Sequence, residues 1–387
     1  MTTFLFWFSL ATLAFVYIFY GLGIWIYNKI FRSNTPGFSE NSELPDVAFV
    51  IAAYNEEEVI GQKILNTLAL DYPTEKLTIY VISDGSTDKT NAIVEEYPQV
   101  KLLWRPQRKG KTAAINRILP GITQAITVFS DANVMVNQNA LQTMVKHYTL
   151  PLVGGVSGEK RVVSADHENA SSTEGIYWKY ESFLKREDAK LNTLVGAAGE
   201  LFSIRTHLFI PVPEDTLLDD FTISMNIIKQ GYTIAYEPNA YASESPSLNI
   251  HEEYKRKVRI GAGGLQSVLR FPEFLNPFQY GVVSFQYIFH RFSRWIISPL
   301  LIPVVYISNG YLINGSNFYL FFFIAQTLFH LASISGWFFE SKNTRFKLLY
   351  IPFYFNFMHY CILAGWVKLI TGKQKVTWQK ATRFATT

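Results

Sequence analysis

The sequence predicts an α/β domain built on a mostly parallel sheet and flanked by transmembrane helices. Residues 47–160 alternate short apolar runs, rich in β-branched and aromatic residues, with longer runs of helical spacing. Apolar strands separated by helices are typical of a parallel sheet that is covered on both faces. Long uncharged stretches precede and follow this region. Together these observations predict a folded domain held at a membrane.

Four of the apolar runs are expected to be strands, each ending in a turn that carries polar residues. A helix is expected after the first strand, where Ile60, Ile64 and Leu68 have helical spacing. A second helix is expected over 112–119. The predicted strands are 47–52, 77–82, 100–104 and 125–129.

The uncharged N-terminal stretch, 1–28, is long enough to cross a bilayer, which takes about 20 apolar residues. A cleaved signal peptide is the alternative, but no basic residue precedes the run and no small-residue cleavage site follows it. Residues 295–339 hold two further candidate spans separated by a polar break, and 348–367 form a fourth. We expect these regions: an N-terminal transmembrane helix (1–29), an α/β domain (45–270), an interfacial segment (271–294), C-terminal transmembrane helices (295–370) and a basic tail (371–387).

Basic residues in the short loops predict the orientation, because Lys and Arg concentrate on the cytoplasmic side. They follow the first span, precede the second and separate the third from the fourth, which places the α/β domain in the cytoplasm, at the inner or plasma membrane. The tail after residue 367 is also basic, with no acidic residue, although four full crossings would put it outside. Either one apolar segment is re-entrant, with the Pro352-containing fourth as the candidate, or the tail is outside against the rule. The basic residues between the segments include Lys29, Arg32, Arg291, Arg294, Lys342, Arg345 and Lys347.

Composition excludes two classes of site. The formal net charge of +4 is modest and is explained by basic residues beside the membrane, so nothing resembles a nucleic-acid-binding surface. The single cysteine, Cys361, lies in an apolar span, which excludes disulfides and cysteine-based metal sites.

Three acidic residues stand where predicted strands end: Asp84, Asp131 and Asp220. In open α/β sheets, ligands bind outside the carboxyl ends of the strands, which favours a shared site. The alternative for each is local structure, since Asp is common in turns and at helix N-caps. The same alternative holds for Tyr54-Asn55-Glu56 after the first strand, where Asn55 would be an N-cap followed by acidic residues in the first helical turn.

The chemistry of the remaining motifs favours a diphosphate, a metal and a base. The basic loop from Arg105 to Lys111 opens a helix and so forms an anion site, or else is simply a solvated loop. Asp131 and Asn133 offer oxygen ligands to a divalent cation, Mg²⁺ or Mn²⁺, with one negative charge fewer than a pair of carboxylates. Asp219 beside Asp220 would raise one pKa, as a general base requires, unless both only cap a helix.

In this order, the motifs resemble those of membrane-bound family 2 glycosyltransferases, the group that includes cellulose, chitin, hyaluronan and poly-N-acetylglucosamine synthases. The resemblance covers about 45–270 and implies a GT-A fold and a nucleotide-sugar donor, most simply UDP-linked. The matching motifs are Tyr54-Asn55-Glu56, Asp84-Gly85-Ser86, Lys109-Gly110-Lys111 with Asn116, Asp131-Ala132-Asn133, Asp219-Asp220 and Gly231-Tyr232.

The resemblance also implies roles for individual residues. Tyr54, Glu56 and Asp84 would hold the uridine, and Lys111 the diphosphate. Asp131 with Asn133 would hold the diphosphate and the metal, and Asp220 would be the base with Asp219 beside it. The acceptor side would include Arg161, Glu174, Trp178, Glu181 and Arg259.

One departure concerns processivity. Processive members carry a Gln-x-x-Arg-Trp motif after the base, whereas this chain has Arg256-Lys257-Val258-Arg259-Ile260, so only the arginine remains. We therefore expect a metal-dependent, inverting glycosyltransferase that transfers a sugar to a glycan or lipid-linked acceptor in cell-surface polysaccharide synthesis. The alternatives are a processive synthase of the same family, a transferase acting on a polyprenyl phosphate, and a non-catalytic membrane subunit.

Overall fold

The computed structural model describes residues 1–32, 43–162, 171–245, 249–341 and 347–377, and it divides into two compact units. The first, here called the membrane unit, comprises Met1–Phe31, Ser164–Glu187 and Ser247–Gln374. The second, the sheet unit, comprises Arg32–Val163, Asp188–Pro246 and Lys375–Thr387. Each is described by itself.

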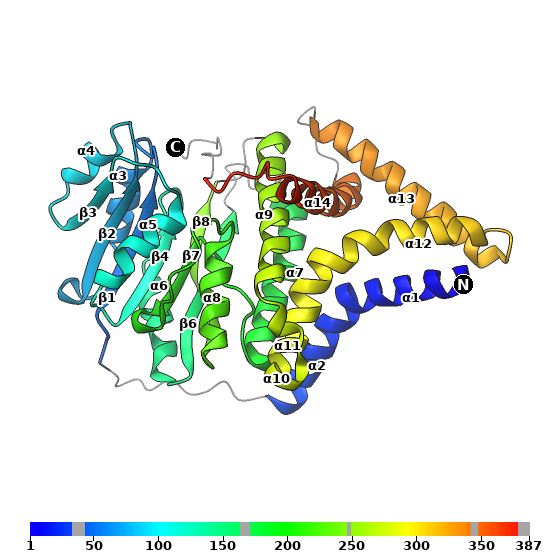
Figure 1. The fold of residues 1–387 in the computed structure, drawn as a ribbon, viewed down its shortest axis with the longest axis horizontal. Helices are drawn as coiled ribbons and strands as arrows, with labels where there is room; N and C mark the ends of the chain where they lie inside the picture. Colours follow the sequence, from blue (N-terminus) through cyan, green and yellow to red (C-terminus); the bar gives the residue numbers. More distant parts are fainter. Residues whose placement is uncertain (33–42, 163–170, 246–248, 342–346, 378–387) are drawn as a thin grey trace. The chain divides into compact units, whose positions relative to one another are not determined.

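The sheet unit is built on an eight-stranded sheet with the order β3-β2-β1-β4-β7-β6-β8-β5 (Figure 1). The first four strands in this order are parallel, β7 is antiparallel to both of its neighbours, and β6 and β8 are parallel to each other. The predicted α/β class with a mostly parallel sheet is confirmed. The strands are β1 (Val47–Ala53), β2 (Leu77–Asp84), β3 (Val100–Arg105), β4 (Ile126–Asp131), β5 (Met135–Val136), β6 (Val153–Val162), β7 (Leu201–Arg205) and β8 (Thr233–Glu244).

Helices cover both faces of the sheet because its central strand is apolar on both sides. Every residue of β1 is buried. Val47, Phe49 and Ile51 belong to one core cluster with side chains from α3, α4 and α6, while α5 contacts β1 and β2 outside that cluster. The helices of the sheet unit are α3 (Ile60–Leu68), α4 (Thr90–Glu95), α5 (Lys111–Ile118), α6 (Ala140–Lys146) and α8 (Asp219–Lys229).

Two expectations about helix starts are wrong. Asn55 is not the N-cap of α3, which begins at Ile60; it sits in a turn at φ 53°. Its side-chain oxygen accepts a hydrogen bond from the Thr87 amide at 2.8 Å, and its own amide donates to Ser86 Oγ at 3.1 Å. Asn55 therefore joins the turn after β1 to the turn after β2, a pairing between distant segments that local spacing does not reveal.

The second correction concerns Asp220. No strand precedes it: Asp219 and Asp220 open α8, and Leu218 is the N-cap residue, without a side-chain cap. The apolar residues before them form no strand; Leu217 is buried just before the start of α8. Neither aspartate serves as the N-cap, so simple capping does not account for the pair.

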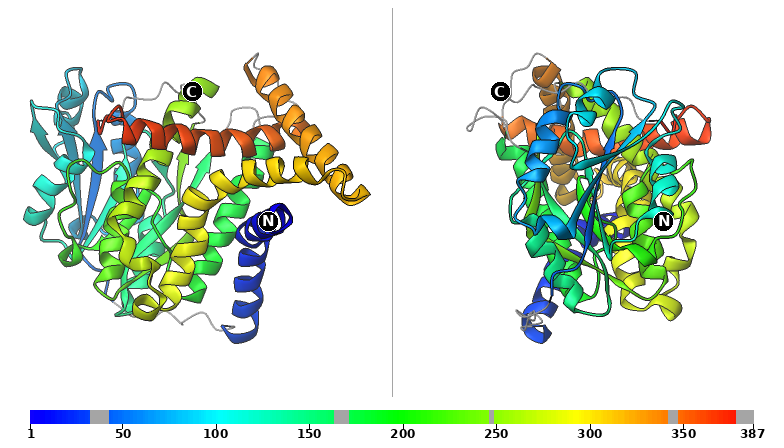
Figure 2. Two further views of the ribbon diagram at one scale, coloured as in Figure 1. Left: turned by 45° about the vertical axis from the view of Figure 1, so that its right-hand side comes forward. Right: turned by 90° about the vertical axis from the view of Figure 1, so that its left-hand side faces the viewer.

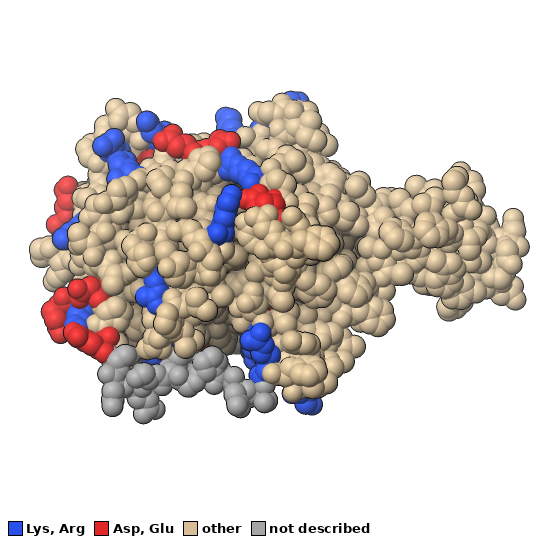
Figure 3. Space-filling view, turned by 60° about the horizontal axis from the view of Figure 1, so that its bottom comes forward, with Lys and Arg blue, Asp and Glu red and all other residues tan. Residues whose placement is uncertain are grey.

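The membrane unit contains four helical stretches that are long and apolar enough to cross a bilayer: Thr2–Phe31, Val282–Gly310, Asn317–Glu340 and Leu348–Ile370. In Figure 3 the part formed by α1, α12 and α13 presents no Lys, Arg, Asp or Glu on the face in view. The helical elements of this unit are α1 (Thr2–Ala14), η1 (Phe15–Phe19), α2 (Tyr20–Phe31), α7 (Ser171–Leu191, up to Glu187), α9 (Ile250–Arg270), α10 (Pro277–Tyr280), α11 (Val282–Gln286), η7 (Tyr287–Ile297), α12 (Ser298–Leu312), α13 (Asn317–Ser341) and α14 (Lys347–Ile370).

The second candidate span, Val282–Gly310, includes Arg291 and Arg294. A buried carboxylate explains how these charges are accommodated. Glu181 of α7 lies 2.8 Å from Arg294, 3.3 Å from Arg291 and 3.1 Å from His290. Burial alone would raise the pKa of Glu181, but Arg294 and His290 hold it well below its ordinary value.

The glycine-rich stretch that follows Arg259 makes a close helix crossing. A Cβ at Gly261 of α9 would lie 2.6 Å from the Cα of Ile362 in α14, and a Cβ at Gly365 would lie 2.5 Å from the Val258 carbonyl. Only glycine permits this approach. Figures 1 and 2 show α14 crossing α9, with α14 seen nearly along its axis in the first view and from the side in the second.

Candidate functional site

Parallel pairing brings the predicted site residues to one edge of the sheet. β1, β2 and β4 all end there, and the register places Asp131 beside Ala52 and Ser83 beside Ala53. Asp84 is the last residue of β2 and Asp131 the last of β4, as predicted. The site therefore begins with the turns that follow three neighbouring strands.

Asp84 fastens the basic loop to the end of β2. Its two carboxylate oxygens accept hydrogen bonds from the backbone amides of Lys109, at 3.0 Å, and Gly110, at 2.6 Å. Gly85, at φ 72°, leaves no room for a side chain, since a Cβ there would lie 2.8 Å from the Arg108 amide nitrogen. The carboxylate of Asp84 thus fixes the path of the loop that leads into α5 and Lys111.

The other two predicted uridine ligands lie beside this turn. The guanidinium of Arg108 stacks on the Tyr54 ring at 3.5 Å from its centroid. Glu56 is buried, and its amide donates to Thr90 Oγ1 at 2.8 Å. Tyr54, Glu56 and Asp84 thus come from two adjacent strand ends, with Arg108 as a neighbour that the sequence did not single out.

Lys111, Asp131 and Asp219 meet at the centre of the site. The ammonium of Lys111, the first residue of α5, lies 2.7 Å from Asp131 Oδ1 and 3.6 Å from Asp219 Oδ2. Burial opposes the charge on Lys111, but Asp131 and Asp219 together raise its pKa above the ordinary value, so the side chain stays charged. The cluster therefore joins the end of β4 (Asp131), the start of α5 (Lys111) and the start of α8 (Asp219).

Asp220 has the protonation behaviour expected of a base. Its partial burial, and next the neighbouring charge of Asp219, raise its pKa to about 7, against the lowering effect of Lys111. Gly199 lies against the Asp220 carboxylate: a Cβ at this glycine would be 3.0 Å from Asp220 Oδ2. Ser224 fixes the helix turn by donating to the Asp220 carbonyl at 2.7 Å.

The sequence did not single out Glu244, a charged residue beside Asn133. The side-chain nitrogen of Asn133 lies 3.3 Å from Glu244 Oε1, and Glu244 forms an ion pair with buried Lys160. Lys160 also contacts Glu200 at 2.5 Å. The signal available was a pair of charged residues, Glu159-Lys160, in a largely apolar run; both are buried in β6, but the partners of Lys160 are distant in sequence.

The donor set fits a divalent cation. Asp131 and Asn133 bring oxygen atoms to one loop, as Mg²⁺ and Mn²⁺ prefer. Two carboxylates, Asp131 and Asp219, face the single ammonium of Lys111, and buried Asp219 Oδ2 accepts no hydrogen bond within the described part of the chain. Among those residues, no group of three or more His, Cys, Asp or Glu has metal-binding geometry, so the protein alone offers an incomplete site.

The predicted acceptor-side residues fall in both units. Arg161 of β6 stacks on the Tyr241 ring in the sheet unit, at 3.5 Å from its centroid. Trp178 of α7 and Arg259 of α9 belong to the membrane unit, where the Trp178 ring lies 5.6 Å from the ammonium of Lys257. Glu181 is occupied by the arginine network described above, and the side chain of Glu174 lies outside the described residues.

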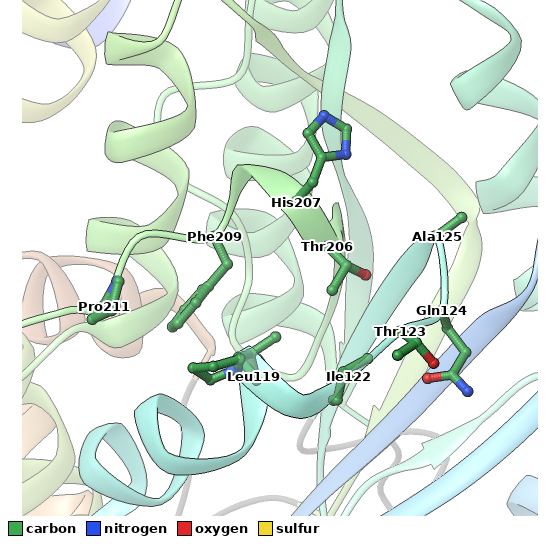
Figure 4. Close-up of a pocket in the computed structure, with 10 residues that line it drawn as sticks. Leu119, Ile122, Thr123, Gln124, Ala125, Thr206, His207, Phe209 and Pro211 are labelled. Carbon is green, nitrogen blue, oxygen red and sulfur yellow. The ribbon is translucent and has the colours of Figure 1, made fainter.

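A cavity of about 490 Å³ lies at the other end of β4 from Asp131. Figure 4 shows its lining, which comes from the connection between α5 and β4 and from residues 206–211, and which includes the apolar residues Leu119, Ile122 and Phe209. It contains none of the predicted site residues, so it is separate from the candidate site.

Comparison with known proteins points to glycosyltransferases. Residues 48–210 match the family model "Glycosyl transferase family 2". A poly-β-1,6-N-acetyl-D-glucosamine synthase of Staphylococcus aureus (strain COL) is 27% identical over 240 residues, which are 59% of this chain and 57% of that protein. A β-monoglucosyldiacylglycerol synthase of Synechocystis is 25% identical over 240 residues, 59% of this chain and 49% of that protein. The chain thus spans about half the length of the curated relatives it matches.

The fold has a solved counterpart. A mannosyltransferase of Pyrobaculum calidifontis, in complex with GDP-Man and Mn²⁺, superposes with a TM-score of 0.70 and 21% identity, covering 96% of this chain and 100% of that one. The fold is therefore GT-A, with four candidate membrane helices flanking the domain. Residues 48–210 are thus similar to a family 2 glycosyltransferase domain.

Proposed function

We propose that the protein is a membrane-bound, metal-dependent, inverting glycosyltransferase. It transfers a sugar from a nucleotide diphosphate donor, UDP-linked, to a hydroxyl of a glycan or lipid-linked acceptor in cell-surface polysaccharide synthesis, with its catalytic domain in the cytoplasm. The observation that carries the proposal is the cluster in which Lys111 bridges Asp131 and Asp219 beside Asp220, whose pKa is raised to about 7.

The mechanism assigns one task to each member of this cluster. Deprotonated Asp220 takes the proton from the acceptor hydroxyl, and the acceptor oxygen attacks the anomeric carbon from the face opposite the diphosphate. The bond from the anomeric carbon to the diphosphate oxygen breaks, and the charge that develops there is stabilised by Lys111. A divalent cation held by Asp131 and Asn133 would neutralise the same leaving group.

The donor's nucleoside is assigned to the turns after β1 and β2. Tyr54 stacked with Arg108 offers a flat surface for a base, and Glu56 and Asp84 lie beside it. Because Asp84 already accepts two backbone hydrogen bonds, its contribution is to shape the loop that receives the diphosphate. Arg161, Trp178 and Arg259 remain candidates for the acceptor side.

Two acceptor classes are supported by different observations. The relatives' names describe an N-acetylglucosamine polymer and a glucosyl lipid, and four candidate membrane helices bring a lipid surface close to the chain.

The absent Gln-x-x-Arg-Trp motif favours short products. In this chain the stretch after Arg259 packs closely on α14 through Gly261.

The test is product analysis with the purified full-length protein. A panel of UDP- and GDP-linked sugars is incubated with oligosaccharide, diacylglycerol and polyprenyl phosphate acceptors in the presence of Mn²⁺, and products are identified by mass spectrometry. We expect transfer from a UDP-sugar that is lost on addition of EDTA and in Asp220→Asn. Transfer to polyprenyl phosphate that survives Asp220→Asn would favour the rival reaction, because an anionic acceptor needs no base. No transfer to any acceptor, with intact nucleotide binding, would contradict the proposal.

A further inference from the structure

A fully buried lysine lies beneath the loop that carries Asp131 and Asn133. Lys63 of α3 has no exposed surface, and its side-chain nitrogen donates to Ser130 Oγ at 2.8 Å and to the Val134 carbonyl at 2.9 Å. The ring of Phe49 lies 5.4 Å away. These two acceptors stand immediately before and after residues 131–133, so one side chain holds both ends of the loop.

Asn66, one turn further along α3, extends the same arrangement. Its side-chain amide makes two hydrogen bonds to the backbone of Val136, donating to the carbonyl at 2.9 Å and accepting from the amide at 2.8 Å. Val136 belongs to β5, which pairs with β8 next to Glu244, the partner of Asn133. Lys63 and Asn66, which share a helix face at a spacing of three, thus fasten the connection from β4 to β5 at three points.

The ordinary explanation is that Lys63 only satisfies two buried acceptors. A methionine of similar length would fill the same space without the cost of burying an ammonium. The Ser130 hydroxyl, moreover, is not lacking a partner, since it donates to the Glu200 carbonyl at 3.1 Å. What the lysine adds is a fixed distance between Ser130 and Val134, and therefore a fixed path for the three residues between them.

We propose that Lys63 is a positioning residue for the cation- and diphosphate-binding loop 131–133. It holds Ser130 and Val134 so that the oxygens of Asp131 and Asn133 are preorganised for one cation, while Asn66 secures the strand that follows. The inference rests on the proposed function and extends it to residues that neither touch the donor nor lie in a recognised motif. Hydrogen-bonded groups behind metal ligands typically change metal affinity about 10–100-fold when removed.

The test uses calorimetric titration of the full-length protein with UDP, once with Mn²⁺ and once with EDTA. In Lys63→Met we expect UDP affinity with Mn²⁺ to fall about tenfold or more, whereas affinity in EDTA stays within about twofold of the wild type. The apparent KM for Mn²⁺ in sugar transfer should rise by a similar factor, and kcat at saturating Mn²⁺ should recover most of its value. Ser130→Ala, which removes one of the two acceptors, should shift the same quantities less and keeps the test open if Lys63→Met does not fold.

Ile60→Ala is the matched control, because it removes buried atoms from the same helix without removing a hydrogen bond to the loop. It should lower the Tm at least as much as Lys63→Met and leave the Mn²⁺ dependence unchanged. Equal loss of Mn²⁺-coupled affinity in both variants, or unchanged or tighter binding in Lys63→Met, would overturn the positioning role. Wild-type UDP binding that ignores EDTA would instead overturn the proposed metal-dependent function on which the inference rests.

Discussion

The ammonium of Lys111 lies 2.7 Å from Oδ1 of Asp131, so the residue expected to hold the diphosphate is paired with the residue expected to hold the metal. In this arrangement the lysine supplies the positive charge that a cation would bring to Asp131. The nucleotide donor and the cation are therefore expected to bind together. The diphosphate can draw the lysine toward its own oxygens, which leaves Asp131 available to the metal.

The first prediction is that divalent cation and nucleotide bind cooperatively. Calorimetry should show weak Mn²⁺ binding to the protein alone, because Lys111 competes for Asp131 and the second ligand is an uncharged Asn133. With UDP present, Mn²⁺ binding should be clear. Asp131→Ala should abolish this coupling, and Asn133→Asp should strengthen Mn²⁺ binding without nucleotide by adding a negative charge. Tight Mn²⁺ binding to the wild type without UDP would contradict the prediction.

The second prediction is that Lys111→Met weakens UDP binding and also destabilises the fold. The substitution leaves the carboxylates of Asp131 and Asp219 facing each other in a largely buried site, and breaking a buried pair by removing one partner typically costs about 3–5 kcal/mol. Thermal melts should therefore show a lower Tm. Lys111→Met combined with Asp131→Asn should recover stability but not UDP affinity, and a double variant as unstable as the single one would count against the pairing.

The third prediction concerns Asp220, whose pKa of about 7 lies above the ordinary value of 3.8 because of burial and then of Asp219. A base must be deprotonated, so kcat should rise as pH increases through about 7 and level off above it. Asp220→Asn should lower transfer by about 10²–10⁴-fold, while UDP binding is retained. Retention of more than about a tenth of wild-type transfer would contradict the base assignment.

Stability gives an independent readout of the same group. A carboxylate whose folded pKa is raised binds more protons in the folded state, so its contribution to the free energy of unfolding is complete below about pH 4 and is lost as pH rises to about 7. Asp220→Asn removes this loss, so the variant should melt no lower than the wild type at pH 8. Asp219→Asn is the control, with a smaller loss of transfer. A larger loss there would move the role to Asp219.

The parts of this site that could be predicted from sequence are those that local chain geometry determines. The strands that end in Asp84 and Asp131 can be predicted because each is an apolar run followed by turn residues. Parallel pairing then brings such strand ends together. The links between distant segments left no comparable signal. Asn55 bonds a turn about 30 residues away, and Glu244 reaches Asn133 across the sheet from β8. Asp220 lies near Asp219 and Lys111 although the strand expected before it does not exist.

The fourth prediction is that the products are short. Arg256 and Ile260 of α9 stand where processive members of the family have Gln and Trp. The glycines that follow pack closely, Gly264 against the Trp295 ring and Gly261 against α14. Electrophoresis and mass spectrometry of products from the purified protein should show one or a few added sugars. A ladder extending to high polymer from this single component would show that α9 supports processive synthesis without the motif.

The last prediction concerns the side of the membrane on which the C-terminal tail lies. Residues 375–377 group with the sheet unit, and Thr377 lies close to Gly110, since a Cβ at Gly110 would be 3.9 Å from Thr377 Cγ2. Four full crossings would place the tail on the other side of the membrane from that unit, so we expect one apolar helix to lie along the membrane surface. We expect this helix to be α14, because it crosses the strongly charged helix α9 at the close contact between Gly261 and Ile362. If the catalytic domain lies in the cytoplasm, as proposed, an alkaline phosphatase fused after Thr387 should be inactive and a fluorescent protein fused there should be fluorescent. The same pair of reporters fused after Gly315, between α12 and α13, should give the opposite result. An active phosphatase at Thr387 would mean that α14 crosses the bilayer.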